Sequence, residues 1–347
     1  MTARIAILYT ELGDYSLACL RALRQQECYV LLVHWPVNPE APFKFKFDFL
    51  DEVHNRDQLS NNQLLNTVKT FKPDLILCSG WMDKGYVNVC RMLNSSSITV
   101  LSLDNHWNAS FKQILATLLA PFTLKRSFDK AFVPGQVQKN YALKLGFKAK
   151  DIQVGFYSAN TSKFLSVYEE THIEKKSDFP KRFLYLGRYV KHKGIFDLWE
   201  AFKRFQKHHD DWELWCVGTG DQYENRVQAS GIKHFGFVQP DQMLPILRQT
   251  GVYILPSHFE PWGVSVHEMA VAGFPMLLSD KIGAREAFLN GNGCAFKSGS
   301  VDELADAMYW VAAKSNEQML RMSEKSHELG MKNTPEIWAE RLMSLLK

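Results

Sequence analysis

Short apolar runs alternate with longer amphipathic segments along most of the chain, and the alternation occurs in two series. Buried strands that alternate with helices are typical of parallel sheets with helices on both faces. In the first series, helical spacing of apolar residues is clearest at Tyr15–Gln26 and Asn62–Phe71. The strands of this series are predicted at Arg4–Thr10, Tyr29–Trp35, Asp74–Ser79, Ile98–Asp104 and Lys130–Pro134.

The second series has the same organisation. Its strands are predicted at Arg182–Arg188, Glu213–Gly218, Val252–Ser257 and Pro275–Asp280. Its helices are predicted at Ile195–His209, Asp241–Gln249, Val264–Gly273 and Asp302–Lys314. Two such series predict an α/β protein that is built from two doubly wound domains.

The boundary between the domains is expected where the periodic pattern is weakest. Tyr168–Lys181 is the most polar and least periodic stretch, and it is the predicted linker. The first domain is therefore predicted at 1–167 and the second at 168–333. The last segment, 334–347, begins with a Thr-Pro pair that favours a helix start, and we expect it to pack back on the first domain.

The composition is that of an ordinary globular protein, because 46% of the 347 residues are apolar and 22% are charged. The sequence contains no apolar run long enough to span a bilayer. The first run, Ile5–Tyr9, is too short for the core of a signal peptide. The six cysteines are scattered without a C-x-x-C pair. This pattern favours reduced thiols in a cytoplasmic protein over a disulfide framework or a zinc site.

The net charge of +4 is unevenly distributed. Ser110–Lys150 contains eight basic residues and one acidic residue, Asp129. Such a surplus attracts anionic lipid or phosphate, although a solvated helical face is the alternative interpretation. The apolar segment Phe111–Phe122 precedes these cations, and it either packs into the core or faces solvent. If it faces solvent, we expect a peripheral location on an anionic membrane surface, at the inner face of the plasma membrane.

Residues just after strands are the first candidates for a site, because open α/β sheets bind ligands beyond the carboxyl ends of their strands. Gly13 opens the helix after the first strand, where backbone N–H groups receive an anion or simply form a tight turn. Arg188 and Lys193 follow the first strand of the second series, in LGRYVKHKG. Arginine grips phosphate through its planar fork and lysine adds a point charge, although solvated surface cations are the alternative.

Two glycine-rich stretches follow later strands, but neither is a dinucleotide fingerprint. VGTG at Val217–Gly220 and GNG at Gly291–Gly293 both lack the third glycine of that motif. The sequence contains no G-x-x-x-x-G-K-[ST] motif either. These observations count against a nicotinamide or flavin oxidoreductase and against a P-loop nucleotidase.

The stretch FEPWGVSVHEMAVAGFPMLLSD places Glu260 and Glu268 around the start of a predicted helix. The backbone N–H groups of Gly263, Val264 and Ser265 would point from the N-terminus of that helix toward a phosphate. A carboxylate beside a phosphate is repulsive unless it binds something else, and a sugar or ribose hydroxyl is the natural partner. Chance spacing of two glutamates on a structural turn is the alternative.

Four motifs in the second series resemble, in order and spacing, those of the retaining glycosyltransferases of family 4, also described as glycosyl transferases group 1. They are GRYVKHKG, VGTG, EPWGVSVHEMAVAGFP and IGAREAF, and the resemblance covers about 180–315. Trp262 departs from the usual Phe, and His267 fills a commonly apolar position. The resemblance implies the GT-B fold, in which two Rossmann-like domains face each other across a cleft.

The resemblance also implies a role for each candidate residue. Arg188 and Lys193 would bind the diphosphate of a nucleotide sugar and neutralise the leaving group. Glu260 would contact the transferred sugar, and Glu268 the ribose. His106, after a strand of the first domain, would lie near the anomeric carbon. The remaining implied donor contacts are Gly13, Gly218, Phe237, Val238, Gly263, Val264 and Ser265, with Phe237 and Val238 meeting the base through their main chain.

The implied reaction moves a sugar, with retention, from a UDP-sugar to a hydroxyl of a glycan or lipid-linked saccharide in bacterial envelope polysaccharide synthesis. No cofactor or metal is expected, because the sequence has no D-x-D and two cations neutralise the leaving group. No nucleic acid is expected as a partner. A nucleotide-sugar epimerase of the same fold and a noncatalytic nucleotide-sugar-binding subunit are the alternatives. Ala41–Glu52, where aromatic and charged residues alternate, is expected to form an acceptor groove or an exposed edge strand.

Overall fold

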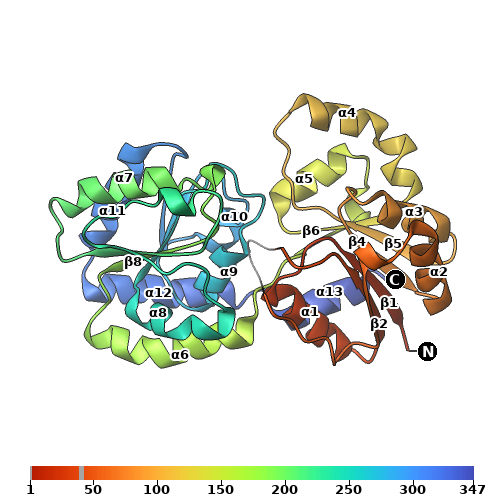
Figure 1. The fold of residues 1–347 in the computed structure, drawn as a ribbon, viewed down its shortest axis with the longest axis horizontal. Helices are drawn as coiled ribbons and strands as arrows, with labels where there is room; N and C mark the ends of the chain where they lie inside the picture. The colour runs from red at the N-terminus through yellow and green to blue at the C-terminus, as the bar shows by residue number, and fades with distance from the viewer. Residues whose placement is uncertain (1, 39–42) are drawn as a thin grey trace. The chain divides into compact units, whose positions relative to one another are not determined.

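The computed structural model describes residues 2–38 and 43–347 of the chain. It divides into two compact units, each with its own sheet (Figure 1). Unit 1 consists of Met1–Ser158 and Asn333–Lys347, and unit 2 is Ala159–Lys332. The division therefore falls at 158/159, nine residues before the predicted boundary at 167/168. In the described part of the chain, no helix combines the length and the apolar composition needed to cross a bilayer.

Unit 1 contains a seven-stranded parallel sheet in the order β3-β2-β1-β4-β5-β6-β7. Its strands are β1 Arg4–Tyr9, β2 Tyr29–His34, β3 Glu52–Asn55, β4 Leu75–Ser79, β5 Ile98–Ser102, β6 Lys130–Val133 and β7 Ile152–Val154. Its helices are α1 Asp14–Arg24, α2 Asn61–Phe71, α3 Lys84–Leu93, α4 Phe111–Leu119, α5 Gln136–Lys144 and α13 Pro335–Ser344. Short 3-10 helices are η1 Arg56–Gln58, η2 Ala120–Phe122, η3 Leu124–Arg126 and η4 Ala149–Asp151.

Unit 2 contains a six-stranded parallel sheet in the order β10-β9-β8-β11-β12-β13. Its strands are β8 Arg182–Leu186, β9 Glu213–Val217, β10 Ile232–His234, β11 Val252–Leu255, β12 Met276–Ser279 and β13 Gly293–Phe296. Its helices are α6 Thr161–Ser177, α7 Ile195–Gln206, α8 Leu244–Gln249, α9 Val264–Val271, α10 Arg285–Phe288, α11 Val301–Ala312 and α12 Asn316–Gly330. The 3-10 helices are η5 Lys191–Lys193, η6 Tyr223–Asn225 and η7 Pro240–Gln242. The two parallel sheets confirm the predicted pair of doubly wound domains.

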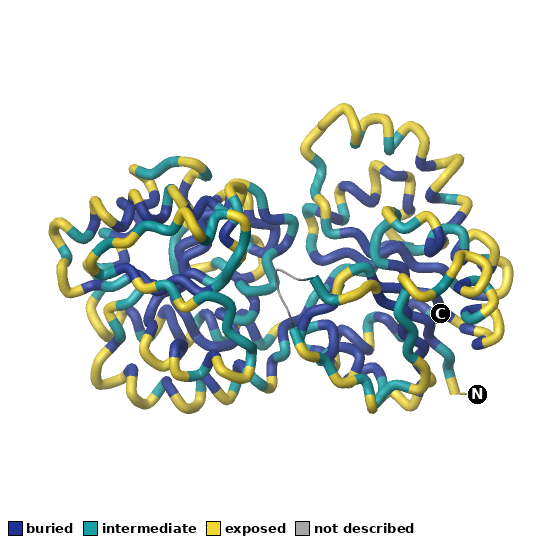
Figure 2. Tube along the Cα trace, viewed as in Figure 1, coloured by how far each residue is buried: buried dark blue, intermediate teal, exposed yellow. Residues whose placement is uncertain are grey.

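The central strands are buried on both faces, as Figure 2 shows for each unit. In unit 1, alternate residues of β1 enter different cores: Ala6 and Leu8 face α2, α3 and α5, whereas Ile5 and Ile7 face α1 and α13. Trp338 of α13 is 1% exposed and stacks on Phe132 of β6 with ring centroids 6.0 Å apart. The last helix therefore completes the core of unit 1.

One expectation about an irregular segment is wrong, and a second segment departs from one of its two expected alternatives. Tyr168–Lys181, the predicted linker, lies mostly within α6 and leads directly into β8. In Ala41–Glu52, residues 41 and 42 lie outside the described residues, and the described part contains no strand before β3 begins at Glu52. Its alternating pattern arises because Phe45, Phe47 and Phe49 pack on the core of unit 1, while Lys46 and Asp48 between them are exposed. The acceptor-groove alternative for this segment stays a prediction.

The order of the strands places one switch point in each unit. The chain moves outward from β1 to β2 and β3, and it then returns to β4 on the other side of β1. In unit 2 the same happens at β8, which lies between β9 and β11. At such a point the loops after two neighbouring strands, β1 and β4 in unit 1 or β8 and β11 in unit 2, run to opposite faces of the sheet. Open α/β sheets bind ligands in the crevice between such loops.

Candidate functional site

The loops after β8 and β11 meet at the switch point of unit 2. The loop after β8 carries Arg188 and ends in η5, and the loop after β11 leads to α9. The two loops are joined by a hydrogen bond in which the His258 N–H donates to the His192 carbonyl, at 2.7 Å. Residues that are almost seventy positions apart in sequence are therefore brought together by the pairing of β8 with β11.

An ion pair joins these loops at their centre. The Lys193 ammonium bonds to the Glu260 carboxylate, and the two side chains are only 15% and 12% exposed. Ser257 Oγ lies 3.5 Å from the same carboxylate oxygen. Burying two charges in this way is a weak source of stability, because the loss of hydration offsets most of their attraction. The pair is therefore better explained by function than by folding.

The backbone holds Glu260 on both sides. Its N–H donates to the Lys281 carbonyl at 3.1 Å, and its own carbonyl accepts from the Gly283 N–H at 3.0 Å. These bonds form an isolated parallel bridge between Glu260 and Ile282. The next loop of the sheet, which carries the sequence IGAREAF, thus fixes the position of the Glu260 carboxylate.

Positive charge is concentrated on the β8 loop. Arg188 is exposed, and its carbonyl accepts a 2.7 Å hydrogen bond from the buried Tyr185 hydroxyl. Burial lowers the pKa of His192, and the positive charges of Lys193 and Arg188 lower it further. Burial and the two neighbouring cations thus favour the neutral imidazole, which leaves Arg188 and Lys193 as the candidate charges for attracting an anion.

Glu260 and Glu268 both influence Tyr253, a buried residue of the preceding strand β11. Burial raises the pKa of Tyr253, the hydrogen bond from Ser265 opposes this, and the negative charges of Glu260 and Glu268 raise it further. The hydroxyls of Tyr253 and Ser265 are 2.8 Å apart. The two carboxylates that sequence reasoning placed at the two ends of one turn thus act on the same buried hydroxyl.

Helix α9 begins between these carboxylates. Gly263 adopts a φ of +93°, a left-handed conformation that favours glycine, and its carbonyl accepts from the Val266 N–H at 3.0 Å. The N–H groups of Val264 and Ser265 belong to the first turn, where backbone donors point out of the helix end. The N-terminus of α9 therefore adds positive partial charge to a site that also carries two carboxylates, Glu260 and Glu268, and two cations, Arg188 and Lys193.

The loop after β9 closes a further side of the site. Gly218 has a φ of +134°, and its N–H donates to the Gly236 carbonyl at 2.7 Å. Gly236 immediately precedes Phe237 and Val238, the residues expected to meet a base, and both are partly exposed. A Cβ at position 218 would overlap the carbonyl oxygen of Gly187. Only glycine lets the β9 loop approach the β8 loop this closely.

We expect Gly218→Ala to lower the free energy of unfolding by about 2–6 kcal/mol, because about 1–3 kcal/mol of backbone strain adds to about 1–3 kcal/mol of overpacking. Gly291→Ala is the matched control, since Gly291 has a φ of +79° and open space around its Cα. It should cost only about 1–2 kcal/mol of left-handed strain. Urea unfolding measures the free energy of unfolding of both variants. An equal loss of stability in the two variants would show that the contact with Gly187 is unimportant.

His267, the departure from the family pattern, is a structural residue. It is fully buried, its Nδ1 accepts the Ala159 N–H at 2.9 Å, and its Nε2 donates to the Gly330 carbonyl at 2.8 Å. The ring also stacks on Phe288 with centroids 4.4 Å apart. An apolar residue would leave the two backbone groups without this bridge between the first residue of unit 2 and the last residue of α12.

Unit 1 has a polar pocket of about 260 Å³ at the carboxyl ends of β1, β4 and β5. The Tyr157 hydroxyl donates to Asp104 Oδ2 at 3.1 Å, and the hydroxyls of Thr10 and Ser79 are 3.0 Å apart. All four residues line the pocket. Burial raises the pKa of Tyr157 well above its usual value, and the negative charge of Asp104 raises it further. The pocket presents hydroxyl and carboxylate groups, which suit a polyhydroxylated ligand.

Two of the predicted site residues, Gly13 and His106, lie in unit 1 and have different surroundings. Gly13 is buried, and its N–H donates to Ser16 Oγ at 3.3 Å, so this amide caps α1. His106 is half-buried in the segment that follows β5, just beyond the pocket-lining residues Asp104 and Asn105. Its carbonyl accepts a 2.8 Å bond from Gln113 Nε2. The roles expected for Gly13 and His106 stay predictions.

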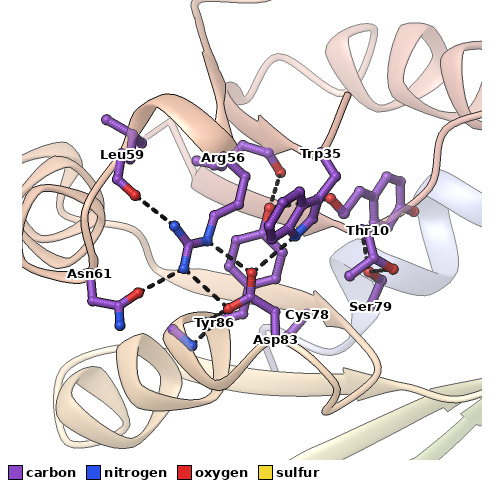
Figure 3. A network of polar contacts seen from close by, with 12 residues as sticks. Thr10, Trp35, Arg56, Leu59, Asn61, Cys78, Ser79, Asp83 and Tyr86 are labelled. Atoms are coloured by element: carbon purple, nitrogen blue, oxygen red, sulfur yellow. Dashed lines mark hydrogen bonds and ion pairs between the residues drawn. The ribbon is translucent and has the colours of Figure 1, made fainter. Parts of the chain in front are cut away.

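Sequence reasoning missed a network that fixes the loops beside this pocket (Figure 3). Arg56 Nε donates to Asp83 Oδ2 at 2.8 Å, and Trp35 Nε1 donates to the same oxygen at 3.0 Å. Burial alone raises the pKa of Asp83, but hydrogen bonds from Arg56 and the Tyr86 N–H bring it below its usual value. The carboxylate therefore ties together the loops after β2, β3 and β4, and no local sequence motif signals these contacts.

The chain is similar in sequence to a known protein family and to individual glycosyltransferases. Residues 168–329 match the family described as Glycosyl transferases group 1. A glycogen synthase of Mycobacterium tuberculosis is 30% identical over 119 residues, 32% of this chain and 29% of the synthase. An N,N'-diacetylbacillosaminyl-diphospho-undecaprenol alpha-1,3-N-acetylgalactosaminyltransferase of Campylobacter jejuni is 23% identical over 257 residues, 70% of this chain and 66% of that transferase. The match to the synthase thus spans less than a third of its length.

The whole chain is also similar to solved structures. The crystal structure of Anabaena HepE with UDP and glucose aligns with a TM-score of 0.72, covers 99% of this chain and 98% of its own, and is 14% identical. A likeness at this identity concerns the fold alone, and it confirms the predicted GT-B class. The match to group 1 confirms the resemblance drawn from the motifs, whereas assignment to family 4 stays a prediction.

Proposed function

We propose, on the premise that residues 168–329 form a glycosyl transferases group 1 domain, that the protein is a retaining glycosyltransferase of family 4. It would move a sugar from a nucleoside diphosphate sugar to an acceptor hydroxyl. The observation that carries this proposal is the Lys193–Glu260 pair at the switch point of unit 2. Arg188, Glu268 and the start of α9 surround that pair with the groups that a diphosphate, a ribose and a sugar require.

In this proposal, the cations bind the leaving group. Arg188 and Lys193 take the diphosphate, together with the N–H groups of Val264 and Ser265 at the start of α9. As the bond between the anomeric carbon and the diphosphate oxygen breaks, its electron pair leaves with the diphosphate. Positive charge that is already in place stabilises this developing negative charge without reorganisation. We propose that the two cations do this without a bound metal ion.

The carboxylates would accept hydrogen bonds from the hydroxyl groups of the donor. Glu268 holds the ribose, and Glu260 holds the transferred sugar beside Lys193, its partner in the ion pair. The acceptor oxygen attacks the anomeric carbon from the face that the diphosphate leaves, and the acceptor proton passes to the departing phosphate oxygen. The new bond therefore has the configuration of the old one. No cofactor takes part in this scheme.

The comparisons support the substrate classes. Anabaena HepE was crystallised with UDP, so uridine diphosphate sugars are the donors that we propose. The Campylobacter relative is named for an undecaprenol-linked acceptor, and this supports a glycan or lipid-linked saccharide as the acceptor here. Synthesis of a bacterial envelope polysaccharide is the corresponding process. The pocket beside Asp104 and Tyr157 is where we propose that the acceptor hydroxyls bind.

Product analysis tests this proposal against both alternatives. The protein is incubated in EDTA with UDP-glucose, UDP-N-acetylglucosamine or GDP-mannose, with and without a panel of saccharide and alkyl glycoside acceptors. We expect acceptor-dependent release of the nucleoside diphosphate and a product whose anomeric configuration, measured by NMR, matches the donor. An altered sugar nucleotide without acceptor would identify an epimerase. Donor binding without release would identify a noncatalytic subunit, and an inverted product would exclude retention.

A further inference from the structure

Helix α4 exposes a continuous apolar stripe rather than burying it. Its large apolar side chains recur at the spacing of one helix face and continue into η2. Such a face normally packs into a core, yet no residue of α4 is buried, and Figure 2 shows the helix as almost entirely exposed. The exposed fractions are Phe111 78%, Ile114 43%, Leu115 45%, Leu118 67%, Leu119 48% and Phe122 66%. These six residues are termed the α4 stripe.

The contacts of α4 with unit 1 use its small side chains instead. Ala116 packs against the core cluster on the α2–α3–α5 face of the sheet, and Ala120, directly after the helix, is fully buried in it. Because the helix packs on unit 1 through these alanines, its larger apolar side chains remain exposed to solvent. A contiguous apolar patch of this kind on a folded protein marks a surface that binds a partner or a membrane.

The charges around the stripe are all of one sign. Residues 110–128 contain three basic residues, Lys112, Lys125 and Arg126, and no acidic residue. The neighbouring helices α3 and α5 add further cations and no acidic residue. Asp83, which caps α3, is neutralised by its buried ion pair with Arg56. An apolar stripe in a purely cationic frame complements a surface with an apolar interior and anionic headgroups.

A groove continues this surface between α3 and the α4–η3 segment. It has a volume of about 450 Å³ and an apolar lining that includes Val87, Ala116, Leu119 and Leu124. Lys84 and Arg91 stand at its edge, and both are exposed. The groove therefore offers apolar contact for an acyl chain beside two cations for a lipid phosphate.

We propose that the α4 stripe, with the groove and its cations, docks unit 1 onto an anionic lipid bilayer. The apolar side chains would enter the boundary between headgroups and acyl chains, and Lys112, Arg126, Lys84 and Arg91 would contact the headgroups. The protein would then act at the inner face of the plasma membrane as a peripheral protein. This surface lies in unit 1 and requires neither a bound donor nor transferase activity.

Sedimentation with vesicles tests the proposal on the full-length protein without any nucleotide sugar. The wild-type protein should bind vesicles that contain phosphatidylglycerol, bind phosphatidylcholine vesicles far less, and be released at about 1 M salt, where the screening length falls to about 3 Å. Lys112→Glu with Arg126→Glu should weaken binding at least about 25-fold, since each cation near the surface contributes about fivefold. Phe111→Ser with Leu118→Ser should weaken it at least tenfold at low salt, where the wild-type protein is bound.

Matched variants on unit 2 serve as controls. Ile173→Ser removes a side chain that is 73% exposed, and Lys203→Glu with Lys207→Glu makes the same charge change as the paired variant on unit 1. Neither should alter vesicle binding. Equal binding to both vesicle types, or unchanged binding by the α4 variants, would overturn the proposal. A doubled solution mass that Phe111→Ser with Leu118→Ser abolishes would instead make a second copy of the chain the occupant, and would overturn it too.

Discussion

Replacing Lys193 with methionine should lower kcat/KM by about 10²–10³-fold, the usual loss when one preorganised group that stabilises developing charge is removed. Methionine keeps the length and apolar stem of the side chain but removes the positive charge. In the account above, that charge meets the diphosphate as it departs. The initial rate of nucleoside diphosphate release, with a donor identified by the product analysis, measures the effect.

The matched control lies two residues away in the same 3-10 helix. Lys191 is exposed, whereas Lys193 is paired with Glu260, so Lys191→Met should leave the rate near that of the wild type. Lys193→Met also leaves a carboxylate buried without its partner, which lowers stability. The double variant Lys193→Met with Glu260→Gln removes that charge and should restore the melting temperature without restoring turnover. A double variant that regains wild-type turnover would show that the pair only supports the fold.

Replacing Lys175 with methionine should stabilise the protein at neutral pH by an amount on the order of 4 kcal/mol. Lys175 of α6 is 1% exposed, and its Nζ lies 4.3 Å from the centroid of the Phe274 ring. Burial lowers the pKa of its ammonium from 10.5 to about 7. Each unit of that shift corresponds to about 1.36 kcal/mol that folding must supply to bury the group. Methionine fills the same space and has no proton to lose.

The pH dependence distinguishes this effect from better packing. Because the pKa of Lys175 is lower in the folded protein, the unfolded chain binds more protons between about pH 7 and pH 10.5, so wild-type stability rises with pH in that window. The advantage of Lys175→Met should therefore be full at pH 7 and below, and it should shrink toward pH 10.5. Urea unfolding across this range measures it. Lys176→Met, at the exposed next position, should change stability by less than about 0.5 kcal/mol. A gain that is independent of pH would contradict the argument.

The sequence pattern predicted the central strands because those strands are buried on both faces and read as apolar runs. It missed β3, β7, β10 and β13, which are edge or near-edge strands of three or four residues with sequences such as EVHN and IKH. These strands depend on pairing with an already formed neighbour and carry no apolar run of their own. Their existence therefore follows from the tertiary structure and not from local composition.

The pattern of α6 was misread, whereas the pattern of α4 left two alternatives open. Helix α6 looked like a linker because both of the buried residues in its part of the expected linker, Thr171 and Lys175, are polar. Helix α4 has a strong apolar stripe, and that pattern was compatible with burial in the core as well as with exposure. Hydrophobic periodicity identifies the face that is apolar, but it does not identify what covers that face.

The candidate site was predicted from residues at strand ends and from the resemblance of four motifs. The pairing of Lys193 with Glu260 was not predictable, because it depends on β8 and β11 being neighbours. The roles of the individual site residues remain predictions that the following measurement addresses.

Calorimetric titration of uridine diphosphate in EDTA tests the central claim most directly, which is that the switch point of unit 2 binds a nucleoside diphosphate. The account predicts binding by the wild-type protein and affinity about ten- to a hundredfold weaker for Glu268→Gln, the value of a lost hydrogen bond to a charged group. Glu260→Gln should bind no more weakly than the wild type, because the diphosphate carries no sugar for Glu260 to contact and Lys193 is freed from its partner. No binding by the wild-type protein, or unaltered affinity in Glu268→Gln, would contradict the account.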